Sequence, residues 1–394
     1  MAVAEVTRRA RWFMLASVVF LVAWQGAALA GLQRRTIVVL GLYGFVLHTL
    51  FGKALSLLPS YFDRQLSVRW APAVQFPLTT LGVVLMAASG MIGVAPVFAQ
   101  VGGVLWFFGV LLFLGAIAWT IRDNPLGSET ATSEANAERR PVDRYANLFM
   151  PIALAYLLYG SYETMAGPLG LPTVIGAYQP RTTHLLAAGT AALLLFAIGF
   201  RLLPRFLVAY PPRWLVWIVL PTGALGPVVV GATLPAGPVF AIGAVIEATA
   251  VIGFALAYVV LFARSDRRRV GFYAVLAGVI AGSVGVGLGL MFGLGYYEAS
   301  LIQAHYRLNL LGFLGLGVIG VSYQFYPPGV ATFTGGGDRT AYAAIGLLAG
   351  GLGLEVIGLI ADLPPVETLG LMVAMVGAVI HAGLLAGLFY QRYG

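Results

Sequence analysis

Gly41 to Pro59 reads GLYGFVLHTLFGKALSLLP, and Asn309 to Pro327 reads NLLGFLGLGVIGVSYQFYP. The two stretches align without a gap and share Leu, Gly, Phe, Gly and Pro at Leu42/Leu310, Gly44/Gly312, Phe45/Phe313, Gly52/Gly320 and Pro59/Pro327. A weaker third copy ends at Pro204, fifteen residues after Gly189, and Gly44 lies fifteen residues before Pro59. The chain therefore contains one helix pattern three times.

The composition places these helices in a membrane. Of the 394 residues, 60% are hydrophobic and only 10% are charged, which excludes an ordinary water-soluble globule. Apolar stretches long enough to cross roughly 30 Å of hydrocarbon recur along the chain, and in lipid such stretches form helices. The first, Trp12 to Gly31, follows three arginines like a signal sequence, but lacks a convincing cleavage site and is expected to remain as a helix. We expect an all-α, polytopic membrane protein.

The hydropathy pattern predicts twelve transmembrane helices. We place them near 12–31, 36–59, 73–95, 98–121, 146–167, 182–204, 213–232, 238–263, 271–294, 304–327, 341–361 and 367–390. With the N-terminus inside, 19 of the 23 Lys and Arg residues fall in cytoplasmic loops or helix ends, and four (Arg34, Arg35, Arg181 and Arg307) fall outside. This split favours an even number of spans with both termini cytoplasmic, in the cell membrane. The net charge of +8 then reflects topology and attraction to anionic lipid, and nucleic-acid binding is not expected.

Two polar breaks divide the chain into units of four helices. Residues 122–145 form a polar stretch expected to be a mobile cytoplasmic linker, and a basic run occupies residues 264–269. The three copies of the repeated helix are then the second helix of each unit. We predict one membrane domain of three pseudo-repeats, at 1–121, 146–263 and 271–390.

The chain has four histidines and no cysteine, so any metal site must rely on His, carboxylate, Met or Tyr. His184 and His305 fall within about one turn of the outer ends of their helices, whereas His48 and His381 lie deeper. Imidazole ligates both haem iron and copper, and facing helices can each contribute one histidine. We consider all four as candidate metal ligands, with His184 and His305 first; capping or hydrogen bonding inside the bundle is the alternative.

Further charged residues accompany the histidines. Glu163, Glu298 and Arg307 are expected at the outer level, where they would tune a haem, hold its propionates through Arg307, or bind a cation. The alternative is that they reach the membrane interface as ordinary surface groups. Charges near mid-membrane are costly and mark a pathway, a partner or a neutralised group; these candidates are Lys53, Glu247 and Glu355.

The segment Gln303-Ala304-His305-Tyr306-Arg307-Leu308-Asn309, running on to Tyr326-Pro327, resembles the tenth helix of haem-copper oxidase subunit I. It is also similar to the NnrS family of haem- and copper-containing membrane proteins. Thr183-His184-Leu185-Leu186 to Leu203-Pro204 has the same form. The resemblance also covers the twelve-helix count and the threefold repeat, and it implies a related scaffold with haem or copper chemistry.

The departures from the oxidases concern their metal ligands. Ile37 stands in the second helix at the position equivalent to His305, and the seventh helix, Trp214 to Ala232, has no histidine. Gln303 replaces the first histidine of the oxidases' His-x-His in helix ten. A dioxygen-reducing oxidase is therefore not expected.

We expect a membrane protein that binds b-type haem, or a metal such as copper, for electron transfer or for handling nitric oxide or a related small ligand. A redox partner would accompany that role. Two other readings remain: a cofactor-free transporter in which Glu247, Glu355, Lys53 and His48 line a path, or a structural subunit of a membrane complex. Whether the protein is an enzyme is left open by its sequence.

Overall fold

The computed structural model describes residues 2–91, 93–176 and 178–393 and contains no strand in those ranges. Its long α-helices are α1 (Ala2–Leu29), α4 (Ala71–Ala88), α5 (Val97–Ile121), α6 (Arg140–Leu169), α9 (Arg213–Thr233), α10 (Pro238–Arg264), α11 (Val270–Gly293), α14 (Asp338–Ile360) and α15 (Pro364–Tyr393). Within the described residues, eleven continuous helical segments are long and apolar enough to cross a membrane. The all-helical, membrane-compatible fold is confirmed.

Three of these segments combine several helical types. They are α2 (Arg34–Val38), η1 (Val39–Leu47) and α3 (His48–Tyr61); α7 (Gln179–His184), η3 (Leu185–Ala192) and α8 (Leu193–Leu207); and α12 (Ala299–Arg307), η4 (Leu308–Leu316) and α13 (Gly317–Phe325). In each, the η element is a π-helix. These are the three copies of the repeated sequence, and each has its π-helix at a matching position.

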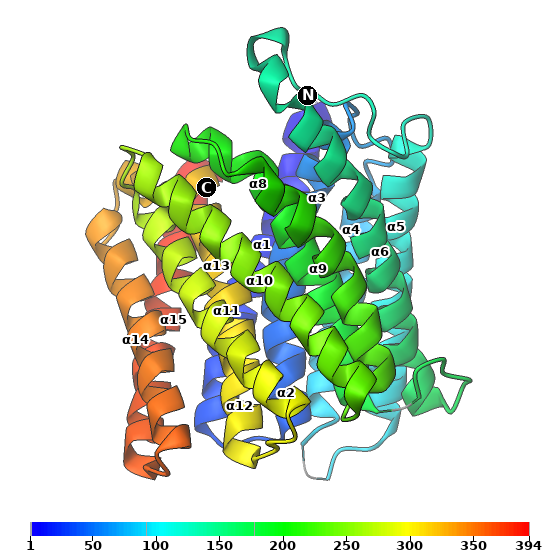
Figure 1. The fold of residues 1–394 in the computed structure, drawn as a ribbon, viewed down its shortest axis with the longest axis vertical. Coiled ribbons are helices and arrows are strands. Elements are labelled where there is room, and N and C mark those ends of the chain that lie inside the picture. The colour runs from blue at the N-terminus through cyan, green and yellow to red at the C-terminus, as the bar shows by residue number, and fades with distance from the viewer. Residues whose placement is uncertain (1, 92, 177, 394) are drawn as a thin grey trace.

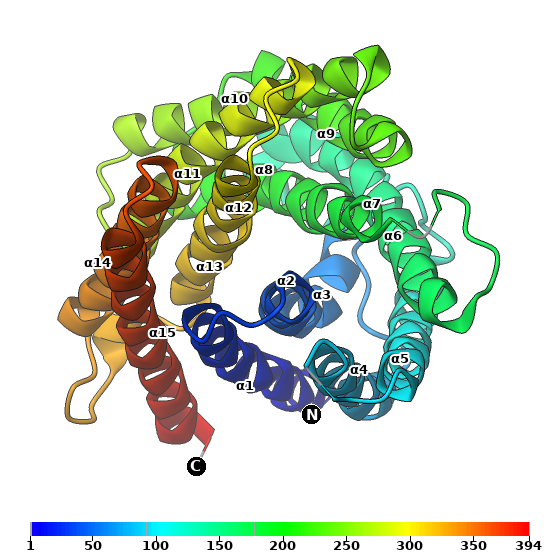
Figure 2. The ribbon, with the colours of Figure 1, turned by 90° about the horizontal axis from the view of Figure 1, so that it is seen from below.

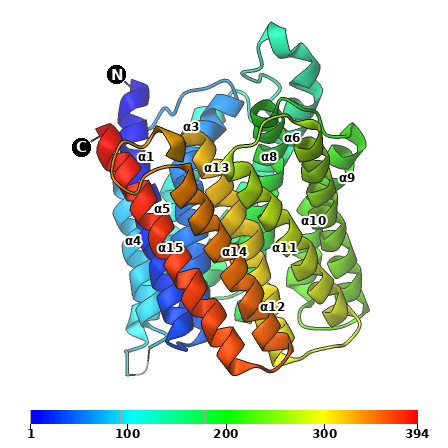
Figure 3. The same ribbon diagram turned by 90° about the vertical axis from the view of Figure 1, so that its left-hand side faces the viewer.

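The helices run side by side, with loops at the two ends of the molecule (Figures 1 and 3). Both termini lie at the same end, which we call the terminal end; α2 and α12 begin at the opposite, distal end. The end-on view in Figure 2 shows α2 and α3 inside a ring that includes α1, α4, α5, α6, α14 and α15. The three π-helices contact one another in the interior, so the repeated helices form the centre of the bundle.

Small residues let the ring pack directly on this centre. The three aligned glycines, Gly44, Gly189 and Gly312, lie inside the π-helices, and a Cβ at each would collide with a neighbouring helix: with Phe20, Tyr156 and Ala281 respectively. The repeat therefore preserves a close contact at the same depth in each copy.

The segment between α5 and α6 is held against the terminal end, unlike the mobile linker expected. The Nδ2 of Asn124 donates to the carbonyl oxygens of Phe62 and Glu129, each at 2.9 Å. Arg64 pairs with Asp123 at 3.0 Å and with Glu129 at 2.7 Å. The last part of the segment is helical, since η2 (Glu134–Arg139) is followed directly by α6, which begins at Arg140.

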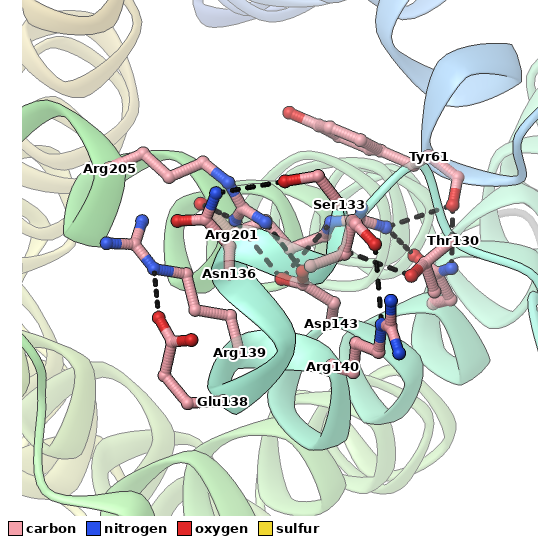
Figure 4. Close-up of polar contacts among 12 residues, drawn as sticks. Tyr61, Thr130, Ser133, Asn136, Glu138, Arg139, Arg140, Asp143, Arg201 and Arg205 are labelled. Atoms are coloured by element: carbon pink, nitrogen blue, oxygen red, sulfur yellow. Dashed lines mark hydrogen bonds and ion pairs between the residues drawn. The ribbon is translucent and has the colours of Figure 1, made fainter.

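A buried charge cluster fixes α6 to α8 beside this segment (Figure 4). Asp143 is 1% exposed; its Oδ2 lies 2.6 Å from Nη2 of Arg205, and its Oδ1 lies 3.6 Å from Nε of Arg201. Arg201 also donates to Oδ1 of Asn147 and, at 3.1 Å, to the carbonyl of Tyr61. Charges that are paired and hydrogen-bonded in this way are tolerated in an interior.

Candidate functional site

A cavity of about 320 Å³ lies at the distal end, between segments of α2, α7, η3, α9, α10, α11, α12 and η4. Its polar lining residues include Arg34, Arg35, Gln179, Thr183, His184, Glu247, Tyr297, His305, Tyr306 and Asn309. Apolar side chains such as Val251, Val286, Phe292, Leu310 and Phe313 form most of the remaining wall. A largely apolar cavity of this size with a few convergent polar groups is typical of small-molecule and cofactor sites.

His184 and Glu247 form one polar pair in the wall. His184 is the last residue of α7, and Glu247 comes from the middle of α10. Nε2 of His184 lies 2.6 Å from Oε1 of Glu247, and the two side chains remain 20% and 15% exposed. Gly226 of α9 packs against the Glu247 side chain, so that a Cβ there would collide with it. The pair is therefore hydrogen-bonded at the edge of an open volume, and the carboxylate orients the imidazole.

His305 lines the same cavity from α12. Its Nδ1 lies 2.8 Å from the carbonyl oxygen of Gly285 on α11, so Nδ1 carries the proton and donates it. Nε2 then bears the lone pair, and it has no hydrogen-bond partner among the described residues. A ring nitrogen held by a backbone carbonyl while the other stays available is the usual arrangement of a metal-ligating histidine. Phe292 packs against the imidazole at 5.3 Å between ring centroids.

Arg34 and Arg35 lie where the cavity meets the distal surface. Both line the cavity, Arg34 exposed and Arg35 half-buried, and neither forms an ion pair within the part of the chain that the structure describes. The guanidinium of Arg34 lies 6.0 Å from the ring of Tyr306. The sequence did not single out Arg34 and Arg35 as site residues. Both were nevertheless expected on the outer side, against the preference of Lys and Arg for cytoplasmic loops.

Arg307 is directed away from the cavity. Its Nε and Nη2 each donate to the carboxylate of Glu355 at 2.7 Å, and Nη2 also donates to Oε1 of Gln25 at 2.8 Å. Its guanidinium lies 5.0 Å from the ring of Trp24. Depth along the helices had grouped Arg307 with the outer histidines and Glu355 with the deeper charges. The structure pairs them instead, because residues two apart on a helix face different neighbours.

His48 and His381 are enclosed elsewhere. Nδ1 of His48 lies 2.8 Å from the carbonyl of Tyr43, and its ring is packed among the rings of Phe13, Phe20 and Trp106. Nδ1 of His381 lies 2.7 Å from the hydroxyl of Tyr323. A void of about 10 Å³, the size of one water molecule, adjoins His381. Neither histidine borders the large cavity.

The remaining candidates lie outside the cavity. Glu163 is buried near the distal end of α6, where its Oε1 accepts a hydrogen bond from the Val174 amide at 2.8 Å. Glu298 is exposed just before α12. The ammonium of Lys53 lies 3.8 Å from the Tyr326 ring centroid and 4.2 Å from that of Phe325. The outer polar cluster expected from the sequence is thus divided among several environments.

The donor set of the cavity suits some cofactors better than others. Among the described residues, no group of three or more His, Cys, Asp or Glu side chains is placed to hold a metal ion. A haem iron, in contrast, needs only one or two axial side chains because the macrocycle supplies the other ligands. His305, with its available Nε2, meets that requirement.

No protein-family model matches this chain, and a search of curated proteins finds no match.

Proposed function

We propose that the chain crosses the cell membrane twelve times, with both termini cytoplasmic, on a scaffold similar to haem-copper oxidase subunit I and the NnrS family. Three four-helix units account for the matching π-helices and glycines of the repeated helices. α6, the fifth span in chain order, would be added to the eleven apolar segments to give twelve. Its polar groups Asn147, Ser161 and Glu163 are buried within the bundle and lower its hydropathy. The distal end is then the outer face.

We further propose that the distal cavity binds a b-type haem, or a related small ligand, for electron transfer or for handling nitric oxide. The observation that carries this proposal is His305 itself: Nδ1 held by the Gly285 carbonyl and Nε2 available in a largely apolar cavity. Haem bound there would supply an iron centre for one-electron chemistry or diatomic ligand binding. Binding of a copper ion directly by the protein is a less well supported form of this proposal, because the cavity offers few side-chain ligands for the metal.

The His184–Glu247 pair would serve that ligand in one of two ways. His184 would be a second ligand of the cofactor besides His305, or it would stay hydrogen-bonded to Glu247 and hold a proton beside the bound ligand. Dioxygen reduction is not part of the proposal, because the seventh span, α9, contributes no histidine.

The alternative hypothesis, a cofactor-free transporter, is less well supported. Its four residues have four separate environments: Glu247 borders the cavity, Glu355 pairs with Arg307, Lys53 packs on aromatic rings, and His48 is enclosed. They do not line one path. A structural subunit of a membrane complex remains an outcome of the test below.

The test is spectroscopic. The protein is purified in mild detergent from haem-replete cells, and its reduced-minus-oxidised spectrum and metal content are measured. We expect a haem Soret band that is lost in His305→Ala and shifted or weakened in His184→Ala. His381→Ala is the control and should keep the band, because His381 does not border the cavity. A colourless, metal-free wild-type protein that cannot be reconstituted with haem would rule the proposal out.

A further inference from the structure

The distal cavity has different chemistry at its two levels. Its interior is formed mainly by aliphatic and aromatic side chains around the histidines, whereas Arg34 and Arg35 border it at the surface. A ligand that fills both levels must have an apolar body and one end that suits positive charge.

The positive charges of Arg34 and Arg35 are not balanced by an ion pair within the described residues. The other two arginines on the distal side have partners: Arg307 pairs with Glu355, and Arg181 donates to the Leu234 carbonyl at 2.5 Å and 3.0 Å. Arg34 and Arg35 have no carboxylate partner among the described residues. Positive charge is also disfavoured on the outer face, where we place these residues.

We propose that the ligand of the distal cavity is an amphipathic anion whose carboxylate groups pair with Arg34 and Arg35 while its apolar body lies against His305. This inference rests on the cavity being a binding site, as proposed above, but not on iron coordination. Guanidinium–carboxylate pairs are strong and directional. They would fix the carboxylate end of this ligand at the cavity mouth. Porphyrins and long-chain fatty acids share the required chemistry.

The experiment compares acids with their neutral esters on the purified protein in neutral detergent. Fluorescence titration measures binding of iron-free protoporphyrin IX and of its dimethyl ester, in which two neutral methyl esters replace the two carboxylates. We expect the acid to bind at least tenfold more tightly than the ester, which corresponds to about 1.4 kcal/mol. In Arg34→Gln/Arg35→Gln, the two forms should bind alike. Arg339→Gln, at an exposed arginine in the first turn of α14 at the terminal end, is the matched control and should retain the preference.

A second pair of probes separates the possible sources of the anion. A fluorescent long-chain fatty acid and its methyl ester are titrated in the same way. A charge preference that depends on Arg34 and Arg35 in either pair supports the inference and identifies the ligand class. Equal binding of acid and ester in both pairs, or a preference that survives in the double variant, overturns it.

The outcome for haem is read separately. His305→Ala should lose haem coordination yet keep the preference for free protoporphyrin IX over its ester. A wild-type protein that shows this preference but never coordinates haem would contradict the proposed function and leave the anion inference standing. Melting temperatures of all variants are measured as the control for misfolding. The double variant should melt like the wild type, because Arg34 and Arg35 make no ion pair within the described residues.

Discussion

His305 and Arg307 lie two residues apart on α12, yet they face two very different regions of the molecule. His305 borders an open cavity, and its Nε2 has no partner within the described residues. Arg307 is fully buried, with a bidentate pairing to Glu355. Both are polar groups in an apolar surrounding. The comparison separates two kinds of polar group in the bundle: one that adjoins empty space and is a candidate for binding, and one that is held in a buried ion pair and is structural.

The largest expected effect comes from breaking the enclosed pair. Glu355→Ala leaves the Arg307 charge buried without its carboxylate, and we expect the free energy of unfolding to fall by about 3–5 kcal/mol. Denaturant or thermal unfolding in detergent measures it. The double variant Arg307→Met/Glu355→Leu removes both charges and should recover most of the loss. If the single variant is as stable as the wild type, the pair does not have the structural role described here.

The cluster at the terminal end should respond in the same direction but less strongly. Asp143→Ala removes the carboxylate shared by Arg201 and Arg205, and we expect a loss of about 3 kcal/mol. Arg205 can regain water because its side chain is already 30% exposed, and Arg201 keeps Asn147 and the Tyr61 carbonyl. The same unfolding assay applies. A loss larger than that of Glu355→Ala would reverse the order predicted by burial.

A smaller loss is expected at an enclosed histidine. His48→Ala removes a ring packed among aromatic side chains and leaves the Tyr43 carbonyl without its partner, so we expect a cost of about 2 kcal/mol. The haem spectrum should not change. A change in the spectrum with no loss of stability would show that His48, not the outer pair, serves the ligand.

The smallest effect on stability is expected in the cavity wall. Glu247→Gln keeps the size of the side chain beside His184 and its contact with Gly226, and the open cavity lets water solvate both groups. We expect a change below about 1 kcal/mol, as for partly exposed pairs. Ligand affinity or its pH dependence should change instead, because the carboxylate charge beside His184 is lost. If Glu247→Gln destabilised the protein as much as Glu355→Ala, the cavity wall and the enclosed ion pair would not differ in their structural role.

Much of the fold follows from the sequence, because long apolar stretches leave few choices in lipid. Depth along each helix also placed His184 and His305 at one level, and the structure brings both to one cavity. That they bind a cofactor stays a prediction. Depth alone did not show that Glu247 joins them, or that Arg307 turns to Glu355, since both facts depend on which helices are neighbours and on rotation about each helix axis.

Other features gave weaker signals. Arg34 and Arg35 were expected on the outer side, against the preference of Lys and Arg for cytoplasmic loops. The sequence did not show that a cavity adjoins them, and only that cavity makes them candidates for binding. Polar composition predicted a mobile segment at 122–145, whereas Asn124 and Arg64 hold it through specific hydrogen bonds that composition does not report.

The π-helices have a consequence for how this chain can change. A π-helix commonly arises when one residue is inserted into an α-helix without disturbing the flanking turns. In η1, η3 and η4 it separates the distal half of each repeated helix from the terminal half. Deleting one residue there would restore α-helical winding and leave the flanking turns in the same orientation. Each repeated helix can therefore gain or lose one residue at its π-helix while its distal end, with His184, His305 or Arg34 and Arg35, stays aligned with a terminal half such as those that carry Arg201 and Tyr323.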